Sequence, residues 1–221
     1  LYPKHIGVHL TGKIGGWTAP KDVILYLAGE LTVSGGTNSI IEYFGSGARS
    51  ISATGKATIT NMGAELGATT SIFSYDERMA AYLRATGREH IADLANQAAD
   101  LLAPDREVEA DPERFFDRVV EIDLTRLEPH VVGPHSPDRA RPISEMAAEV
   151  YDKKNGFVDE IDTALIGSCT NSSYEDMSRA ADIANQARDH GISAVVPLMV
   201  TPGSEKVRAT IERDGQLDAL R

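Results

Sequence analysis

Apolar residues at helical spacing mark the first element that the sequence predicts. In residues 17–31, Val23, Ile24 and Leu27 fall on one face of a helix. Pro20 stands at the start, where the missing N–H costs a helix little. Similar patterns predict further helices over residues 75–102 with a break near Gly87, over 143–156 ending at Gly156, over about 172–190, and over 202–215 with Ser204 and Gly215 as caps.

Short apolar stretches between these helices predict strands. They cover residues 39–45, 118–124, 162–168 and 193–201. Residues 50–73 are rich in Gly and Thr, and we interpret them as a buried helix to about Gly67 followed by a strand through Ile72. The order strand–helix–strand–helix after residue 161 indicates a βαβ unit, and therefore an α/β fold with a parallel sheet.

Proline-rich and polar segments divide the chain. Residues 103–115 are polar and predict a surface loop, and residues 128–145 contain four prolines without a strong period. We therefore expect an α/β domain over residues 1–135, a linker and connecting helix over 136–160, and a further α/β unit over 161–221.

Charge and composition disfavour binding to nucleic acid and to membranes. The 221 residues carry a formal net charge of −11, which repels nucleic acid and anionic membranes. No run of 18 apolar residues predicts a transmembrane helix. The N-terminus has neither an initiator Met nor a signal-peptide pattern, as expected for an internal part of a larger protein.

The single cysteine of the chain, Cys169, is the first candidate for chemistry. It is predicted at the carboxyl end of a parallel strand and at a helix N-terminus, where a thiolate is favoured. This position suits a nucleophile or a metal ligand better than a core residue, and a buried structural cysteine remains the alternative. A hydrolase lacks support, because Asn171 replaces the last glycine of a nucleophile elbow and His190 lies at the far end of the helix. One thiolate cannot hold a zinc or iron–sulfur centre, so any other ligands lie outside this chain.

A resemblance to a known family bears on that choice. The segment IGSCTNSSYEDM (166–177) resembles the first cluster-cysteine motif of the aconitase family. Four further segments resemble the mitochondrial type of that family in the same order, and NMGAELGATTS favours it over isopropylmalate dehydratase or homoaconitase. These segments are residues 16–37, 51–79, 124–134 and 201–215.

The resemblance implies the fold and activity of an aconitase. The fold would be built of three-layer α/β/α units with largely parallel sheets. Residues 1–135 would correspond to the second domain, and residues 161–221 to the first half of the third, which carries the first cluster cysteine. The intact enzyme isomerises citrate to isocitrate through cis-aconitate with a [4Fe-4S] cluster as Lewis acid. The location would be the mitochondrial matrix or the bacterial cytoplasm. The partners of this chain would be the missing domains of the same protein, and the chain alone would be inactive and bind no cofactor.

The resemblance also implies roles for individual residues. Cys169 would be one of three cluster thiolates, with the other two beyond Arg221. Asn61 and Glu65 are four residues apart, so on a helix they share a face, and they match the family residues that approach water bound to the cluster. Thr170 and Asn171 would donate hydrogen bonds to cluster sulfurs. Independently of the resemblance, the residue types predict that Asn171 or Ser172 caps the following helix. The alternatives are a hydro-lyase of the isopropylmalate dehydratase or homoaconitase type, and a non-catalytic binding module.

Overall fold

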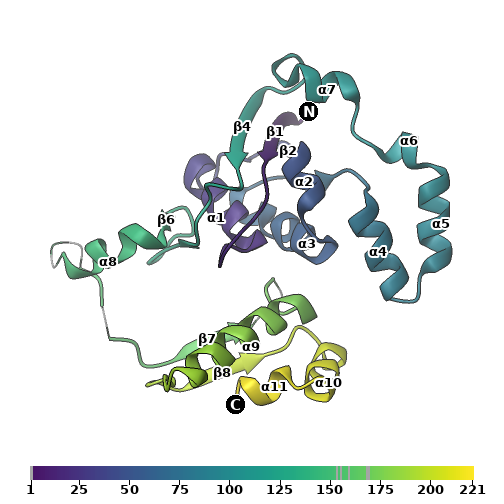
Figure 1. Cartoon of the computed structure of the whole chain (residues 1–221). Helices are drawn as coiled ribbons and strands as arrows, with labels where there is room; N and C mark the ends of the chain where they lie inside the picture. The colour runs from purple at the N-terminus through teal and green to yellow at the C-terminus, as the bar shows by residue number, and fades with distance from the viewer. Residues whose placement is uncertain (1, 153, 155, 159, 168–169) are drawn as a thin grey trace. The chain divides into compact units, whose positions relative to one another are not determined.

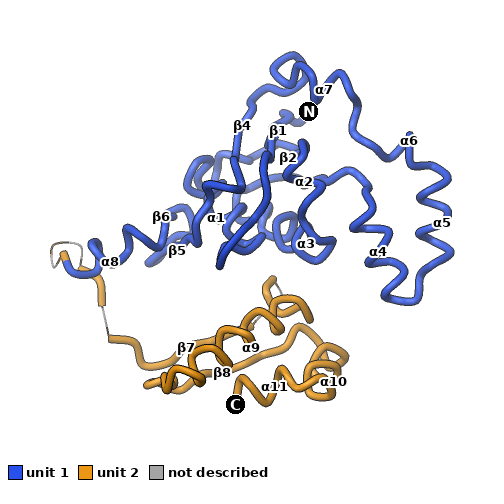
Figure 2. The backbone as a smooth tube through the Cα atoms, in the orientation of Figure 1, with its two compact units in different colours: residues 1–151 blue, residues 152–221 orange. Residues whose placement is uncertain are grey.

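The chain divides into two compact units, residues 1–151 (unit 1) and 152–221 (unit 2), shown in Figure 2. The structure is a computed structural model that describes all residues except 1, 153, 155, 159, 168 and 169. Each unit contains a parallel sheet with helices, which confirms the α/β class (Figure 1). The division at residue 151 falls inside the segment 136–160 in which we expected a linker and connecting helix.

The elements of unit 1 alternate between strands and helices along most of its length. The strands are β1 (Lys4–Thr11), β2 (Ser39–Phe44), β3 (Thr70–Phe73), β4 (Arg118–Asp123), β5 (His130–Val131) and β6 (Arg141–Pro142). The helices are α1 (Pro20–Leu31), α2 (Ser46–Ser50), α3 (Ala53–Asn61), α4 (Glu77–Ala85), α5 (Glu89–Gln97), α6 (Ala99–Leu102), α7 (Arg106–Ala110) and α8 (Ile143–Tyr151), with 3-10 turns η1 (Met62–Leu66) and η2 (Pro112–Arg114).

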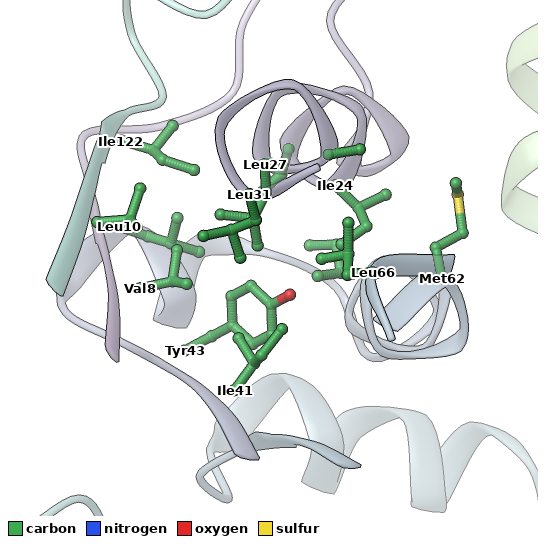
Figure 3. Packing of buried hydrophobic residues seen from close by; sticks show 14 of the residues in the cluster. Val8, Leu10, Ile24, Leu27, Leu31, Ile41, Tyr43, Met62, Leu66 and Ile122 are labelled. Atoms are coloured by element: carbon green, nitrogen blue, oxygen red, sulfur yellow. The ribbon is translucent and has the colours of Figure 1, made fainter. Parts of the chain in front are cut away.

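The main sheet of unit 1 is parallel, with the strand order β3-β2-β1-β4. Its register places Val8 of β1 beside Tyr43 of β2 and Val120 of β4, so these side chains point to the same face. Figure 3 shows that face meeting Leu27 and other apolar side chains of α1. This contact between sheet and helix forms the core of the unit.

Helix α1 follows the sequence pattern closely. Pro20 occupies the first turn as predicted, and the Asp22 carboxylate accepts a hydrogen bond from the Ala19 N–H at 2.7 Å. The carboxylate thus supplies a hydrogen-bond acceptor for the Ala19 N–H, which has no acceptor within the helix. Val23, Ile24 and Leu27 are then fully buried, so amphipathic spacing and packing agree.

The opposite face of the sheet is packed by aromatic rings. Phe116 fills the space beside Gly7, where an added Cβ would lie 2.4 Å from the ring. Phe44 stacks between Phe116 and His9, with ring centroids 5.3 Å and 5.0 Å apart. The chain that returns from β3 to β4 therefore contributes to this second layer, as expected for a parallel sheet covered on both faces.

Several segments of unit 1 differ from the prediction. Strand β1, at the centre of the sheet, was not predicted. Residues 103–115 were predicted as a loop but contain α7 and η2. Residues 128–145 were predicted as a linker but contain the antiparallel pair β5–β6.

Unit 2 is smaller and its sheet has two parallel strands in the described residues. Its elements are β7 (Ala164–Gly167), α9 (Tyr174–Asp189), β8 (Leu198–Thr201), α10 (Glu205–Arg213) and α11 (Gln216–Ala219). They confirm the predicted βαβ unit, although the strands are shorter than predicted. Its core is formed by Met177, Ala181, Ile211 and Leu220, with Ile166 and Val200 of the strands packed against it. Across the described residues, no helix is long and apolar enough to span a membrane.

Candidate functional site

The turn from α3 into η1 positions Asn61 and Glu65. The Ser52 hydroxyl caps the start of α3 by accepting a hydrogen bond from the Gly55 N–H at 3.0 Å. The α-helix ends at Asn61 and continues as a 3-10 turn to Leu66. Our expectation of one continuous helix to Gly67 is therefore wrong. Because a 3-10 turn has about three residues per turn, a spacing of four no longer aligns two side chains.

Despite this change of helix type, both candidate side chains are exposed. Met62 and Leu66 turn into the core, and Asn61 and Glu65 remain in solvent. The Glu65 carboxylate makes no hydrogen bond or ion pair with the residues that the structure describes. The exposed Glu65 carboxylate can accept hydrogen bonds from a ligand, and the Asn61 side-chain amide can both donate and accept them.

The backbone around the η1 turn is closely packed and hydrogen-bonded. The Leu66 carbonyl accepts a hydrogen bond from the Gly36 N–H at 2.9 Å. At Gly63 a Cβ would lie 2.3 Å from the Ser71 hydroxyl of β3, so glycine allows the turn to approach the strand. Gly67 ends the turn at φ +77°, a left-handed conformation that also favours glycine. The sequence thus presents Glu65 on a rigid turn.

In unit 2 the candidate loop begins at the carboxyl end of β7. Cys169 and Ser168 lie outside the described residues. On one side of them, Gly167 approaches Thr201 so closely that a Cβ would lie 2.6 Å from the Thr201 carbonyl oxygen. On the other side, the Ser172 carbonyl accepts a hydrogen bond from the Gly203 N–H at 3.0 Å. The loop ends therefore lie beside the end of β8, at the edge where parallel sheets usually bind ligands.

The helix that follows this loop is capped by Ser173. The Asp176 N–H donates to the Ser173 hydroxyl oxygen at 3.2 Å, and the Asp176 carboxylate accepts from the Ser173 N–H at 3.1 Å. Our expectation that Asn171 or Ser172 caps the helix is therefore wrong. Ser172 is buried, and Thr170 and Asn171 are half-buried. The Asp176 carboxylate also places a negative charge at the helix N-terminus, which competes with any thiolate for the same stabilisation.

The donor set for a metal is incomplete in this chain. Among the described residues, no group of three or more His, Cys, Asp or Glu side chains could hold a metal ion. The sequence contains one cysteine. This chain could therefore supply one thiolate, and by itself it does not fit a cluster that needs several.

The sequence analysis missed a buried ion pair that joins α3 to the start of α4. The Lys56 ammonium of α3 contacts the Asp76 carboxylate, and their side chains are 4% and 13% exposed. The other Asp76 oxygen accepts from the Met79 N–H at 3.1 Å and so caps α4. An Asp directly before a helical pattern is a recognisable signal for a cap, but nothing local indicates its partner Lys56.

The described residues define an α/β protein in which unit 1 presents an exposed turn at Asn61 and Glu65. In unit 2, Gly167 and Ser172 lie beside the end of β8. The aconitase family (aconitate hydratase) matches residues 1–221 by its sequence profile. The chain belongs to this family.

Individual relatives agree with the family match. The mitochondrial aconitate hydratase of Schizosaccharomyces pombe is 58% identical over 219 residues, which are 99% of this chain and 27% of that protein. The corresponding enzyme of Emericella nidulans is 58% identical over 218 residues, and that of Saccharomyces cerevisiae is 55% identical over 220 residues, with 99% of this chain and 27% of each relative covered. The chain thus spans about a quarter of the length of these relatives.

Proposed function

We propose that this chain is part of an aconitate hydratase, a hydro-lyase that interconverts citrate and isocitrate through cis-aconitate. The observation that carries this proposal is the 58% identity over 99% of the chain to a protein of that name. Because the chain covers 27% of that relative, the activity is proposed for the intact protein. We also propose that the chain alone does not catalyse the reaction, and that its partners are the remaining domains.

For Cys169 we propose the role of one ligand to a [4Fe-4S] cluster in the intact protein. The support is its motif and the position of the described loop ends beside Thr201. One thiolate does not hold such a cluster, so the remaining ligands belong to other parts of the protein. Thr170 and Asn171 are proposed as hydrogen-bond donors to the cluster, which matches their half-buried position in the same loop.

For Asn61 and Glu65 we propose direct contact with water or a substrate hydroxyl in the active site. A rigid turn keeps both side chains exposed, which suits groups that must meet a ligand in a fixed geometry. The Glu65 carboxylate would accept a proton or hydrogen bond from water, and the Asn61 amide would orient the same molecule. Neither role requires the burial of an unpaired charge in this chain.

The relatives are named as mitochondrial enzymes, and we propose the mitochondrial matrix as the location of the intact protein. A bacterial cytoplasmic location and a related hydro-lyase activity remain the alternatives. Assays of the intact protein with isocitrate and with isopropylmalate separate the two activities, since the proposal requires turnover of isocitrate.

The role of Glu65 is tested by Glu65→Gln in the intact protein. The substitution keeps the shape and removes the charge, so the free energy of unfolding should change by less than about 0.5 kcal/mol. Turnover of cis-aconitate should fall more than about tenfold. Glu89→Gln, at an exposed carboxylate of α5, is the matched control and should keep full activity. Equal activity of Glu65→Gln and the parent would contradict the proposed role.

The role of Cys169 is tested by Cys169→Ser in the intact protein. The visible absorption of the cluster should disappear while the circular dichroism of the fold remains. A variant that keeps its full iron and sulfide content would show that Cys169 is not a ligand. The isolated chain supplied with iron and sulfide should stay colourless and should not hydrate cis-aconitate.

A further inference from the structure

The loops after three neighbouring strands of unit 1 each bring a basic side chain to the carboxyl edge of the sheet. Lys13 follows β1, Arg49 lies in α2 after β2, and Arg78 lies in the first turn of α4 after β3. With Ser46 and Ser50 they line one cavity of about 530 Å³. Open α/β sheets bind ligands outside the carboxyl ends of their strands, so this cavity lies where a ligand is expected.

The backbone holds Lys13 at the rim of this cavity. Gly12 before it has φ +69° and approaches Thr125 so closely that a Cβ would lie 2.6 Å from the Thr125 methyl group. Ile14 after it packs against the hydrophobic core. Since both neighbours are anchored, the loop cannot swing Lys13 away without breaking core contacts.

Arg78 is also held in place, and its charge lies in an unfavourable position. Asp76 caps α4 and pairs with buried Lys56, which fixes the start of that helix. A cation in the first turn opposes the helix dipole, and Glu77 beside it offsets this only partly. An anion bound in the cavity would stabilise the arrangement.

Two of the three basic groups lack a partner within the described part of the chain. Lys13 and Arg78 make no hydrogen bond or ion pair there. Arg49 pairs with Glu109 at 2.7 Å, and Glu77 is the acidic residue of the lining. On a chain with a net charge of −11, most basic groups are expected to find acidic partners, so two unpaired cations in one cavity, Lys13 and Arg78, require an explanation.

We propose that this cavity binds a small oxyanion ligand with at least two negative charges, carried by phosphate or carboxylate groups. Arg78 would contact two oxygens with its planar guanidinium, and Lys13 would contribute a point charge. The Ser46 hydroxyl would add a hydrogen bond. The site is separate from the turn at Asn61, because α3 runs back from the carboxyl edge to the start of β3. It therefore does not depend on the proposed hydratase function.

The proposal is tested by titrating the 221-residue chain with inorganic pyrophosphate and, separately, with tricarballylate, at low ionic strength in a calorimeter. We expect saturable binding of one equivalent. Tighter binding of pyrophosphate identifies a phosphate ligand, and tighter binding of tricarballylate identifies a carboxylate ligand. Arg78→Gln and Lys13→Gln should each weaken binding about tenfold, as loss of a charge-assisted hydrogen bond does.

Matched controls separate a site from general charge attraction. Arg84→Gln removes a cation from the same helix, and Lys4→Gln removes one from the amino end of β1. Both should change the dissociation constant by less than about twofold, because screening weakens distant surface charges. Absence of saturation with both probes at millimolar concentration would overturn the proposal. Equal weakening by the control variants would also overturn it.

Discussion

The two units show how differently a parallel sheet can be covered by its own chain. In unit 1, Val8 of β1 and Ile41 of β2 are fully buried, and α1 covers their face of the sheet. In unit 2, Leu165 of β7 and Met199 of β8 pair in register yet are 57% and 54% exposed. One face of the second sheet therefore has no cover among the described residues of its own unit. Unit 1 thus covers this apolar face of its sheet with its own helix, whereas unit 2 leaves apolar side chains of its sheet exposed.

The largest expected consequence is a difference in local stability, measured by native-state hydrogen exchange. Each fully buried large apolar side chain contributes about 1.5–3 kcal/mol. Among the described residues of unit 2, the buried core is formed by Met177, Ala181, Ile211 and Leu220. The most protected amides of β7 and β8 should therefore open with a free energy several kcal/mol below those of β1 and β2. Equal protection of the amides in both sheets would show that the smaller core of unit 2 does not lower its stability.

The second prediction compares the same substitution in the two sheet environments. Leu27→Ala removes a fully buried side chain from the core of unit 1 and should lower the free energy of unfolding by about 2–5 kcal/mol. Leu165→Ala removes a side chain that is 57% exposed and should cost less than about 0.5 kcal/mol. Urea titrations followed by circular dichroism measure both. A large loss from Leu165→Ala would mean that the exposed face is covered in solution.

The third prediction concerns the buried ion pair between Lys56 and Asp76 of unit 1. Lys56→Met leaves the Asp76 carboxylate, 13% exposed, without its partner. The loss should be about 2 kcal/mol, below the 3–5 kcal/mol of a fully buried pair because some solvent reaches Asp76. Lys56→Met combined with Asp76→Asn should recover most of it in the same urea titration, since no charge then remains unpaired. Failure of the double variant to recover stability would assign the loss to packing of the lysine stem.

Strand β1 shows why some of the fold escaped the sequence analysis. Ile6, Val8 and Leu10 alternate as a strand should, but His5, Gly7 and His9 on the other face argue against a central position. The structure resolves the conflict because Phe116 fills the space over Gly7 and Phe44 stacks on His9. These contacts come from residues far away in sequence, so local patterns do not contain them.

The segment 128–145 failed as a prediction for the same kind of reason. Its prolines suggested a linker, yet Arg141 is buried and its guanidinium donates to the Gly133 carbonyl at 2.6 Å and contacts Glu149 at 2.6 Å. A pair of short strands held by a buried arginine has no periodic signal. Composition indicates how a segment behaves in isolation. In residues 128–145, contacts with distant residues determine the structure, so composition alone did not predict it.

The candidate site was predictable in part. A short motif indicated the turn at Asn61, and the structure places Asn61 at the end of α3. Cys169 lies outside the described residues, so its position stays a prediction. The type of helix at Glu65 was not predictable, because it depends on how closely Gly63 approaches Ser71. The capping residue was not assigned correctly either, since several adjacent polar residues before α9 all suit that role, and only the bond between Ser173 and Asp176 distinguishes them.

The smallest expected effect compares serine caps in the two units. The Ser52 hydroxyl caps α3 in unit 1, and the Ser173 hydroxyl caps α9 in unit 2. Replacing either by Ala should cost about 1 kcal/mol, because one helix amide loses its acceptor. Ser52→Thr and Ser173→Thr keep the acceptor and should each lose less than half as much.

The readout should differ between the units although the local loss is similar. In unit 1, α3 packs against α1 and β3, so the loss should spread over the cooperative core and appear as a uniform fall in the stability of its slowest amides. In unit 2 the same loss is a larger fraction of a small total, so exchange should accelerate first in the opening turn of α9, around Met177. If both alanine variants gave the same uniform change, unit 2 would be as cooperative as unit 1 and its uncovered sheet face would not limit its stability.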